Sequence, residues 1–142
     1  MNNQNYSNHQ RFVAGYHYFT LLGITVLLIG AIVNLIKSSP ENLYSASLIV
    51  LGSLLLGFTA FYARSFALRA QDRVIRAEEN FRHYLLTNKA LPLELNIRQI
   101  IGLRFAADEE FPALVEKAIQ EKMTEKEIKK SIKKWRGDYY RV

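Results

Sequence analysis

The residues best suited to chemistry lie in the carboxy-terminal half of the chain, around Arg104. Helical spacing places Arg104 on the apolar face of a predicted helix, and Asp108 follows four positions later. An arginine on an apolar face needs a partner for its charge. Two interpretations fit: a site that binds an anion, or an internal ion pair between Arg104 and Asp108 at the corner between two helices. We favour the ion pair.

Asp108 also begins a run of three carboxylates that continues through Glu109 and Glu110. Such a run at the start of a helix more often compensates the helix dipole than binds a metal ion. The sequence has no cysteine, no Ser-His-Asp arrangement and no glycine-rich phosphate loop. The three histidines fit no metal-ligand spacing: His9, His17 and His83. We therefore expect no enzymatic activity, no metal and no cofactor, and no small-molecule substrate is identifiable.

A concentrated group of cations lies near the carboxy terminus. Its members are Lys126, Lys129, Lys130, Lys133, Lys134 and Arg136. The group is either a solvated helix surface or a face that binds a partner or anionic lipid headgroups, to which each cation contributes roughly 1 kcal/mol. Nucleic-acid binding is not expected, because no recognised fold or aromatic platform accompanies the charge.

Two long uncharged runs precede these residues. They are Tyr18–Ile36, of 19 residues, and Leu43–Ala63, of 21 residues. As helices, each reaches about 30 Å, the thickness of the hydrocarbon core of a bilayer. Signal-peptide cores are shorter, roughly 7–15 residues. We therefore predict two transmembrane spans.

Residues 37–42 separate the two spans and include Pro40, which cannot continue a helix. So short a connection permits only a tight antiparallel hairpin. Four arginines follow the second span: Arg64, Arg69, Arg73 and Arg76. By the positive-inside tendency, the tail (64–142) is cytosolic, and so is the amino-terminal segment (1–17) that carries Arg11. The expected location is the inner (cytoplasmic) membrane, with both termini in the cytosol.

Small and polar residues interrupt both spans. They are Gly23, Gly30 and Asn34 in the first span, and Ser53 and Gly57 in the second. Small residues let transmembrane helices approach closely, and an amide side chain can form an interhelical hydrogen bond. We predict that they pack the two spans against each other, with a dimer face as the alternative.

The second span has no helix breaker until Asn88, so one long helix is predicted over 43–86. Its cytosolic part repeats apolar residues at a 3-4 spacing: Ala67, Ala70, Val74, Ala77, Phe81 and Tyr84. Packing against the rest of the tail and self-association explain this repeat equally well. Asp72 with Arg76, and Glu78 with Arg82, have the i,i+4 spacing of ion pairs on an exposed face.

Three shorter helices are predicted after it, with Asn96, Asp108 and Thr124 as their caps. Thr124 and Glu127 have the spacing of a capping box. The last helix should carry Ile132 and Trp135 on its apolar face and stop at Gly137. The fold class is therefore all-α: a two-span hairpin, a long cytosolic helix and a small bundle of three helices.

Several stretches together resemble a family of uncharacterised short bacterial membrane proteins, a domain of unknown function. They are Asn5-Tyr6 with Asn8-His9, Gln71–Arg76, Leu103–Glu110 with Pro112-Ala113-Leu114 (an LRFA-x-DEE-x-P motif), Glu127-Ile128-Lys129, and Trp135. The resemblance covers nearly the whole chain. The family pattern has serine where Ala107 stands, so the cap at that corner would be shared with Asp108. The resemblance implies two spans and a cytosolic helical tail, and it supplies no activity.

We interpret the sequence as a non-enzymatic, membrane-anchored interaction or scaffold module. The expected partners are the lipid bilayer and either a second copy of the chain or another membrane protein. The alternative is an accessory subunit of a transporter or small pore, suggested by the glycines and Asn34 in the spans.

Overall fold

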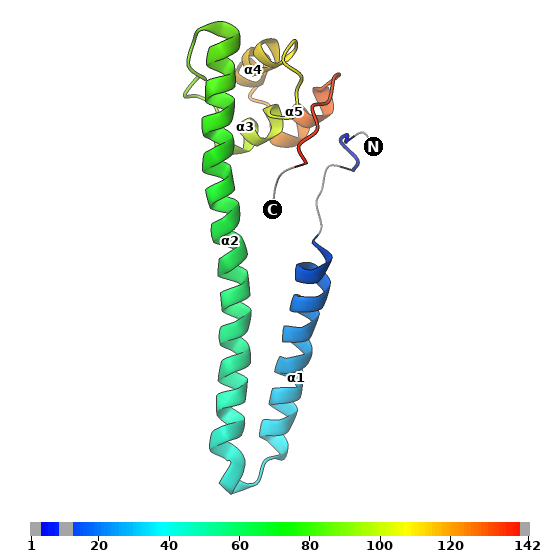
Figure 1. The fold of residues 1–142 in the computed structure, drawn as a ribbon, viewed down its shortest axis with the longest axis vertical. Helices are drawn as coiled ribbons and strands as arrows, with labels where there is room; N and C mark the ends of the chain where they lie inside the picture. The colour runs from blue at the N-terminus through cyan, green and yellow to red at the C-terminus, as the bar shows by residue number, and fades with distance from the viewer. Residues whose placement is uncertain (1–3, 9–12, 140–142) are drawn as a thin grey trace. The chain divides into compact units, whose positions relative to one another are not determined.

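The computed structural model describes residues 4–8 and 13–139, so the expectations for His9 and Arg11 lie outside it. The described residues form helices joined by short connections and no named strand (Figure 1). They divide into two compact units, one of residues 13–67 and one of residues 4–8 with 68–139. The fold is therefore all-α, as predicted.

The first unit contains a π-helical turn, Gly15–Thr20, then helix α1, Leu21–Lys37, and the beginning of helix α2. A single 3-10 turn, Pro40–Asn42, leads into α2 at Leu43. The helices are interrupted at residues 38–42, within the predicted connection 37–42, because Lys37 still belongs to α1. The first apolar helix begins three residues earlier than expected, at Gly15 instead of Tyr18.

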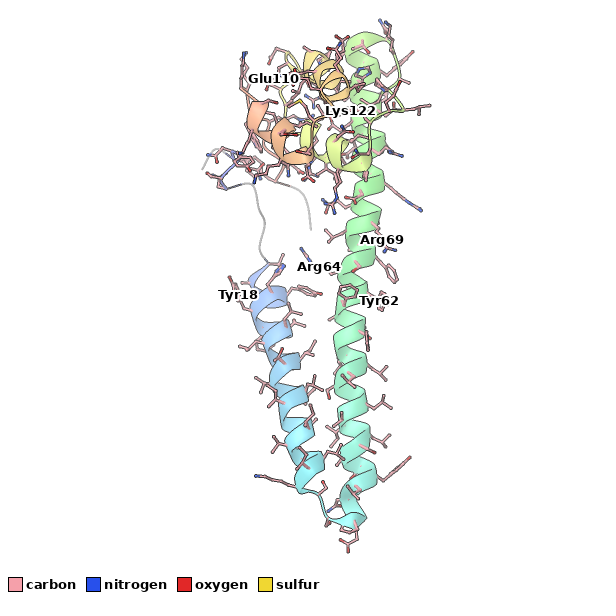
Figure 2. The ribbon with its side chains drawn as sticks, turned by 180° about the vertical axis from the view of Figure 1, so that it is seen from behind. Tyr18, Tyr62, Arg64, Arg69, Glu110 and Lys122 are labelled. Atoms are coloured by element: carbon pink, nitrogen blue, oxygen red, sulfur yellow. The ribbon has the colours of Figure 1, made fainter. Side chains whose placement is uncertain are left out.

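Both helical segments of this unit are long and apolar enough to cross a membrane. Only 6% and 11% of the residues in their most apolar 18-residue windows are buried. Large apolar side chains such as Phe19, Ile36 and Phe58 are more than half exposed. Side chains project from both helices along their length (Figure 2). These helices therefore turn apolar surface outward and do not form a closed core.

Contacts between α1 and α2 involve small side chains. Ser53 of α2 is buried, and its hydroxyl donates to the carbonyl oxygens of Ile49 and Val50 in the preceding turn. A Cβ atom at Gly57 would lie 3.7 Å from Cγ2 of Ile24 in α1. Gly57 thus lies against α1, and the packing role predicted for Ser53 and Gly57 stays a prediction.

Gly23, Gly30 and Asn34 do not lie at this contact, so their predicted packing between the two helices is wrong. All three are exposed, and a Cβ at either glycine would meet no atom within 4 Å. The physical reason is their angular position on α1. Successive helical residues differ by about 100°, which places these three on a different face from Ile24 and Ala31.

Helix α2 extends from Leu43 to Thr87, which confirms the long helix predicted over 43–86. It ends where Asn88 adopts a left-handed conformation with φ of 56°, a conformation that Asn tolerates better than most residues. The backbone N–H of Asn88 still donates to the carbonyl of Tyr84.

In the second unit, three short helices lie beside the carboxy-terminal part of α2 (Figure 1): α3, Ile97–Leu103; α4, Phe111–Gln120; and α5, Glu125–Ser131. Ile75 of α2 joins their apolar core. Among the core residues with no exposed surface are Leu103, Phe105, Phe111, Ala118 and Ile128. The predicted bundle of three helices is present.

Two of the three predicted helix caps are confirmed. Asn96 begins α3 and Thr124 begins α5, each in a complete capping box with the residue three positions later. The third is wrong: α4 is preceded by Glu110, which makes no side-chain cap bond, and Asp108 lies outside the helix. Its carboxylate binds Arg82 of α2 instead.

The last helix is shorter than predicted. It ends at Ser131, and Ile132 is extended, with φ of −66° and ψ of 124°. Trp135 was expected on the helix but pairs with Ala106 in an isolated antiparallel bridge. We call residues 132–138 the carboxy-terminal strap. Its backbone follows the α3–α4 corner because stacking and hydrogen bonds there replace the helical ones.

The capping box of α5 yields a first prediction. Thr124→Ala removes the hydroxyl that accepts from the backbone N–H of Glu127, and should destabilise the helix by about 1 kcal/mol. Thr124→Ser keeps the hydroxyl and is the matched control. Amide hydrogen exchange of α5 in the full-length protein in detergent measures the effect. Equal protection in the two variants would contradict the role of the cap.

Candidate functional site

Arg82 is the centre of the polar network that joins α2 to the α3–α4 corner. Its Nη1 lies 3.0 Å from Oε2 of Glu79, and its Nε and Nη2 each lie 2.6 Å from Oδ1 of Asp108. Nη2 also donates to the carbonyl oxygen of Ala106, at 2.6 Å. The guanidinium carbon lies 4.3 Å from the centre of the Phe111 ring. Arg82 thus has an acceptor at each of its three nitrogens, while its side chain is nearly buried.

The predicted ion pair between Arg104 and Asp108 is wrong. Asp108 pairs with Arg82, and Nη1 of Arg104 lies 3.1 Å from Oδ2 of Asp138 in the strap. The i+4 spacing failed because α3 ends at Leu103, so Arg104 and Asp108 do not share a helix face. The alternative that we did not favour, an anion site at Arg104, is not tested by this pairing.

The strap is held by backbone and ring contacts to the corner. The N–H of Ala107 donates to the carbonyl of Lys134, and the N–H of Arg136 donates to the carbonyl of Phe105, at 2.7 Å. The ring of Trp135 stacks on Phe105 with centres 4.8 Å apart. The cationic groups of Arg104 and Lys129 lie within about 5 Å of the same ring. Phe105 is therefore enclosed by aromatic and cationic groups.

The three consecutive carboxylates contact α2 and the strap. Asp108 binds Arg82, and Glu109 lies 3.8 Å from Nζ of Lys134. Both oxygens of Glu110 accept backbone N–H groups of the strap, from Lys133 and Lys134. Within residues 4–8 and 13–139, no group of three His, Asp or Glu side chains lies together as a metal site would require. The three carboxylates therefore bind the α3–α4 corner to α2 and to the strap.

The six predicted cations do not share one helix face. Lys126, Lys129 and Lys130 belong to α5, whereas the other three belong to the extended strap. Lys129 is buried and lies 2.6 Å from Oε1 of Glu125. The other five remain exposed, with Lys134 and Arg136 each within 4 Å of a glutamate carboxylate, so a basic surface persists. Its binding to lipid or a partner stays a prediction.

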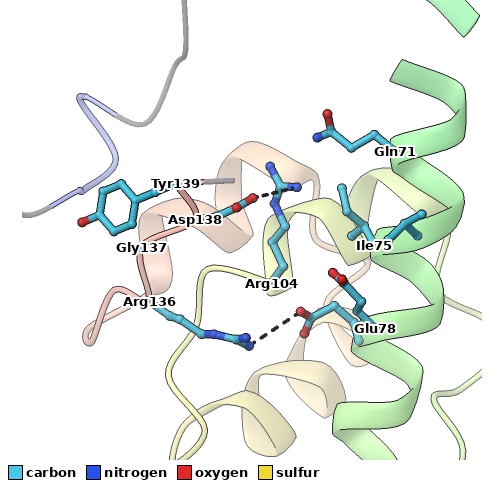
Figure 3. A pocket seen from close by; sticks show the side chains of 10 residues that line it. Gln71, Ile75, Glu78, Arg104, Arg136, Gly137, Asp138 and Tyr139 are labelled. Atoms are coloured by element: carbon cyan, nitrogen blue, oxygen red, sulfur yellow. Dashed lines mark ion pairs between the residues drawn. The ribbon is translucent and has the colours of Figure 1, made fainter. Parts of the chain in front are cut away.

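A cleft of about 510 Å³ lies between α2 and the strap. Two ion pairs lie at its edge: Arg104 with Asp138, which Figure 3 shows, and Nη1 of Arg136 with Oε1 of Glu79, at 3.8 Å. Burial raises the pKa of Glu79 above the ordinary glutamate value, although the charges of Arg82 and Arg136 act in the opposite direction. The cleft is thus bounded by two ion pairs and by the carboxylate of Glu78.

A match to a family of unknown function covers residues 1–142. The chain belongs to DUF6526. No curated protein and no solved structure matches it. The resemblance to a domain of unknown function is confirmed, and the DUF6526 match assigns no activity.

In this DUF6526 chain, the LRFA-x-DEE stretch is a structural corner. The sequence identified the stretch but missed its partner on α2, Arg82, and the buried Glu79 that Arg82 also binds. We predicted Arg82 to pair with Glu78 on the exposed face, whereas it pairs with buried Glu79 at i,i+3. Spacing alone could not separate the two glutamates, since both lie within one turn of Arg82.

The polar network centred on Arg82 yields a second prediction. Arg82→Met leaves the buried carboxylate of Glu79 without its nearest cation, and should destabilise the bundle by about 3 kcal/mol. Arg136→Gln is the control, because Arg136 is half exposed and 3.8 Å away, so its loss should remove less than about 1 kcal/mol. Hydrogen exchange of α3 and α4 amides in detergent measures both. Equal losses would refute the central place of Arg82.

The raised pKa of Glu79 yields a third prediction. Because the folded state holds this proton more tightly than the unfolded chain, the stability contributed by Glu79 is greatest below about pH 4.5 and falls as the pH rises through the raised pKa. The unfolding free energy of the wild type minus that of Glu79→Gln should therefore decrease with rising pH.

Glu127 supplies the opposite case in the same experiment. Hydrogen bonds from the N–H and hydroxyl of Thr124 lower the pKa of Glu127, so its contribution is present at neutral pH and is lost as the pH falls. The wild type minus Glu127→Gln difference should increase with pH. Parallel pH profiles for the two pairs would show that one assignment is wrong.

Proposed function

We propose that this protein is an integral protein of the cytoplasmic membrane, in which α1 and the first half of α2 form a hairpin across the bilayer. On this proposal, the second unit is a folded cytosolic module that binds other proteins and performs no catalysis. The observation that carries the proposal is the contrast between two helices with exposed apolar surfaces and a helical bundle with a completed core.

Exposure supports lipid as the medium around these helices. In a soluble protein, a helix this apolar would be buried by the rest of the chain, yet only 6% and 11% of the windows are buried. Helices satisfy their backbone hydrogen bonds internally, which makes them suitable for hydrocarbon. The serine and threonine hydroxyls in these helices follow the same rule, since Thr25, Ser53 and Thr59 donate to carbonyls of their own helix.

The charges and rings at one end of the two helices support the orientation. Tyr18, Tyr62 and Arg64 lie at the same end of this unit (Figure 2), as expected at a membrane–water interface. Tyr16 donates its hydroxyl proton to the carbonyl of Ala60 at 2.6 Å, and the guanidinium of Arg64 lies over its ring. With the arginines that follow, this end is the cytosolic one by the positive-inside tendency.

A binding role is favoured over catalysis by how the polar side chains of the corner are engaged. Arg82, Asp108 and Glu110 each bind another part of the same unit and hold the strap or α2 in place. Such a network builds a rigid platform. The exposed lysines of α5 and the strap add a basic surface that could contact anionic headgroups or an acidic partner.

The absence of cysteine makes the topology directly testable, which gives a fourth prediction. Ser39→Cys, in the turn before α2, and Lys130→Cys, on α5, each carry one thiol, and both positions are exposed. In intact spheroplasts, a membrane-impermeant maleimide should label Ser39→Cys and not Lys130→Cys. After lysis it should label both.

The cysteine-free wild type is the background control for this labelling. Labelling of Lys130→Cys in intact spheroplasts would contradict a cytosolic second unit. Protection of both thiols until lysis would contradict a membrane-crossing hairpin, because it would place both positions on the inner side.

A further inference from the structure

The tail segment of α2 carries an apolar surface that no other described residue covers. It consists of the 3-4 repeat Ala70, Val74, Ala77, Phe81 and Tyr84, which we call the α2 seam. All five residues are exposed, with 54% of Val74 and 62% of Phe81 accessible. The sequence left open whether the bundle or a second copy covers this repeat.

The structure shows that the bundle binds the other side of the helix. The residues of α2 buried by the bundle are Ile75, Glu79, Arg82 and His83. With about 100° between successive residues, their mean direction is roughly opposite to that of the α2 seam. The bundle therefore does not bury the 3-4 repeat. The α2 seam stays exposed although the core of the bundle is complete.

We propose that the α2 seam is the contact surface for a second copy of this chain, in a parallel two-stranded coiled coil. In heptad terms, Val74 and Phe81 occupy a positions, and Ala70, Ala77 and Tyr84 occupy d positions. The small residues at the d positions Ala70 and Ala77, between the larger residues at a, permit close approach of two such helices there.

The flanking charges select a second copy in parallel orientation. Arg73 falls at a g position and Glu78 at the e position five residues later. In a parallel pair, a g residue of one helix faces this e residue of the other, so two copies place Arg73 against Glu78 twice by symmetry. Both side chains are exposed, and neither forms an ion pair within the described residues. The charges of one copy therefore complement those of a second, identical copy.

Anchoring in one bilayer would bring two copies together in the same orientation, and here the inference rests on the proposed function. A soluble coiled coil needs at least three to four heptads, which the α2 seam does not have. Two copies anchored in one bilayer share an orientation, which enforces the parallel arrangement, and their confinement raises the effective concentration. Leu93, 98% exposed beside the groove that Arg73 and Ala77 line, adds apolar surface along the same edge.

Disulfide cross-linking of the full-length protein in native membranes tests this inference, with one thiol per chain. Ala70→Cys and Ala77→Cys place thiols at two d positions, and each should form a covalent dimer under mild oxidation. The matched controls are the neighbouring exposed positions, Arg69→Cys and Arg76→Cys, which point away from the seam and should remain monomeric. An antiparallel pair cannot cross-link both d positions, since they lie two helical turns apart.

Charge reversal tests the selection of a second copy. In the Ala77→Cys background, Arg73→Glu or Glu78→Arg alone should reduce the dimer several-fold, because like charges then face each other. The double reversal should restore it. Failure of the double reversal to restore cross-linking would overturn the g–e′ pairing.

Other outcomes separate the two proposals. If the protein stays in the membrane and the d positions cross-link no better than the controls, the inference fails and the proposed function stands. An adduct of a mass other than twice that of the chain would overturn the second copy as the partner. If the protein leaves the membrane in alkaline buffer, the proposed function fails, whatever the cross-links show.

Discussion

The structure depends on an imbalance between its two units in how much apolar surface each one leaves exposed. The bundle around Phe105 and Phe111 encloses its own apolar side chains, whereas α1 and the first half of α2 expose theirs. The other described residues leave these two helices largely uncovered, with only 6% and 11% of their most apolar windows buried. The proposed bilayer resolves this imbalance, because lipid takes the place of protein around the exposed residues.

One continuous helix connects these two environments. Helix α2 has 45 residues, and its two ends contact different parts of the protein. Near Ser53, small residues of α2 lie next to α1. Near the other end, Arg82 binds residues of the α3–α4 corner. Since Glu110 and Trp135 hold the strap to that corner, the position of the strap depends on contacts that begin with α2.

Much of the fold could be predicted from local signals. The capping boxes at Asn96 and Thr124, and the end of α2 at Asn88, follow from preferences that act within a few residues. The errors concern contacts between distant segments. Arg82 reaches Asp108 across 26 positions, and Trp135 leaves its predicted helix to stack on Phe105. Periodicity identified the apolar face of each segment without identifying what covers it, and for this reason Gly23, Gly30 and Asn34 were misplaced.

The central claim is that lipid surrounds α1 and the first half of α2. Extraction of native membranes with alkaline carbonate, followed by mild detergent, tests it most directly. The account predicts that the full-length protein remains in the membrane pellet with carbonate and becomes soluble only with detergent. Recovery of a stable, monodisperse species in the carbonate supernatant, without detergent, would contradict it.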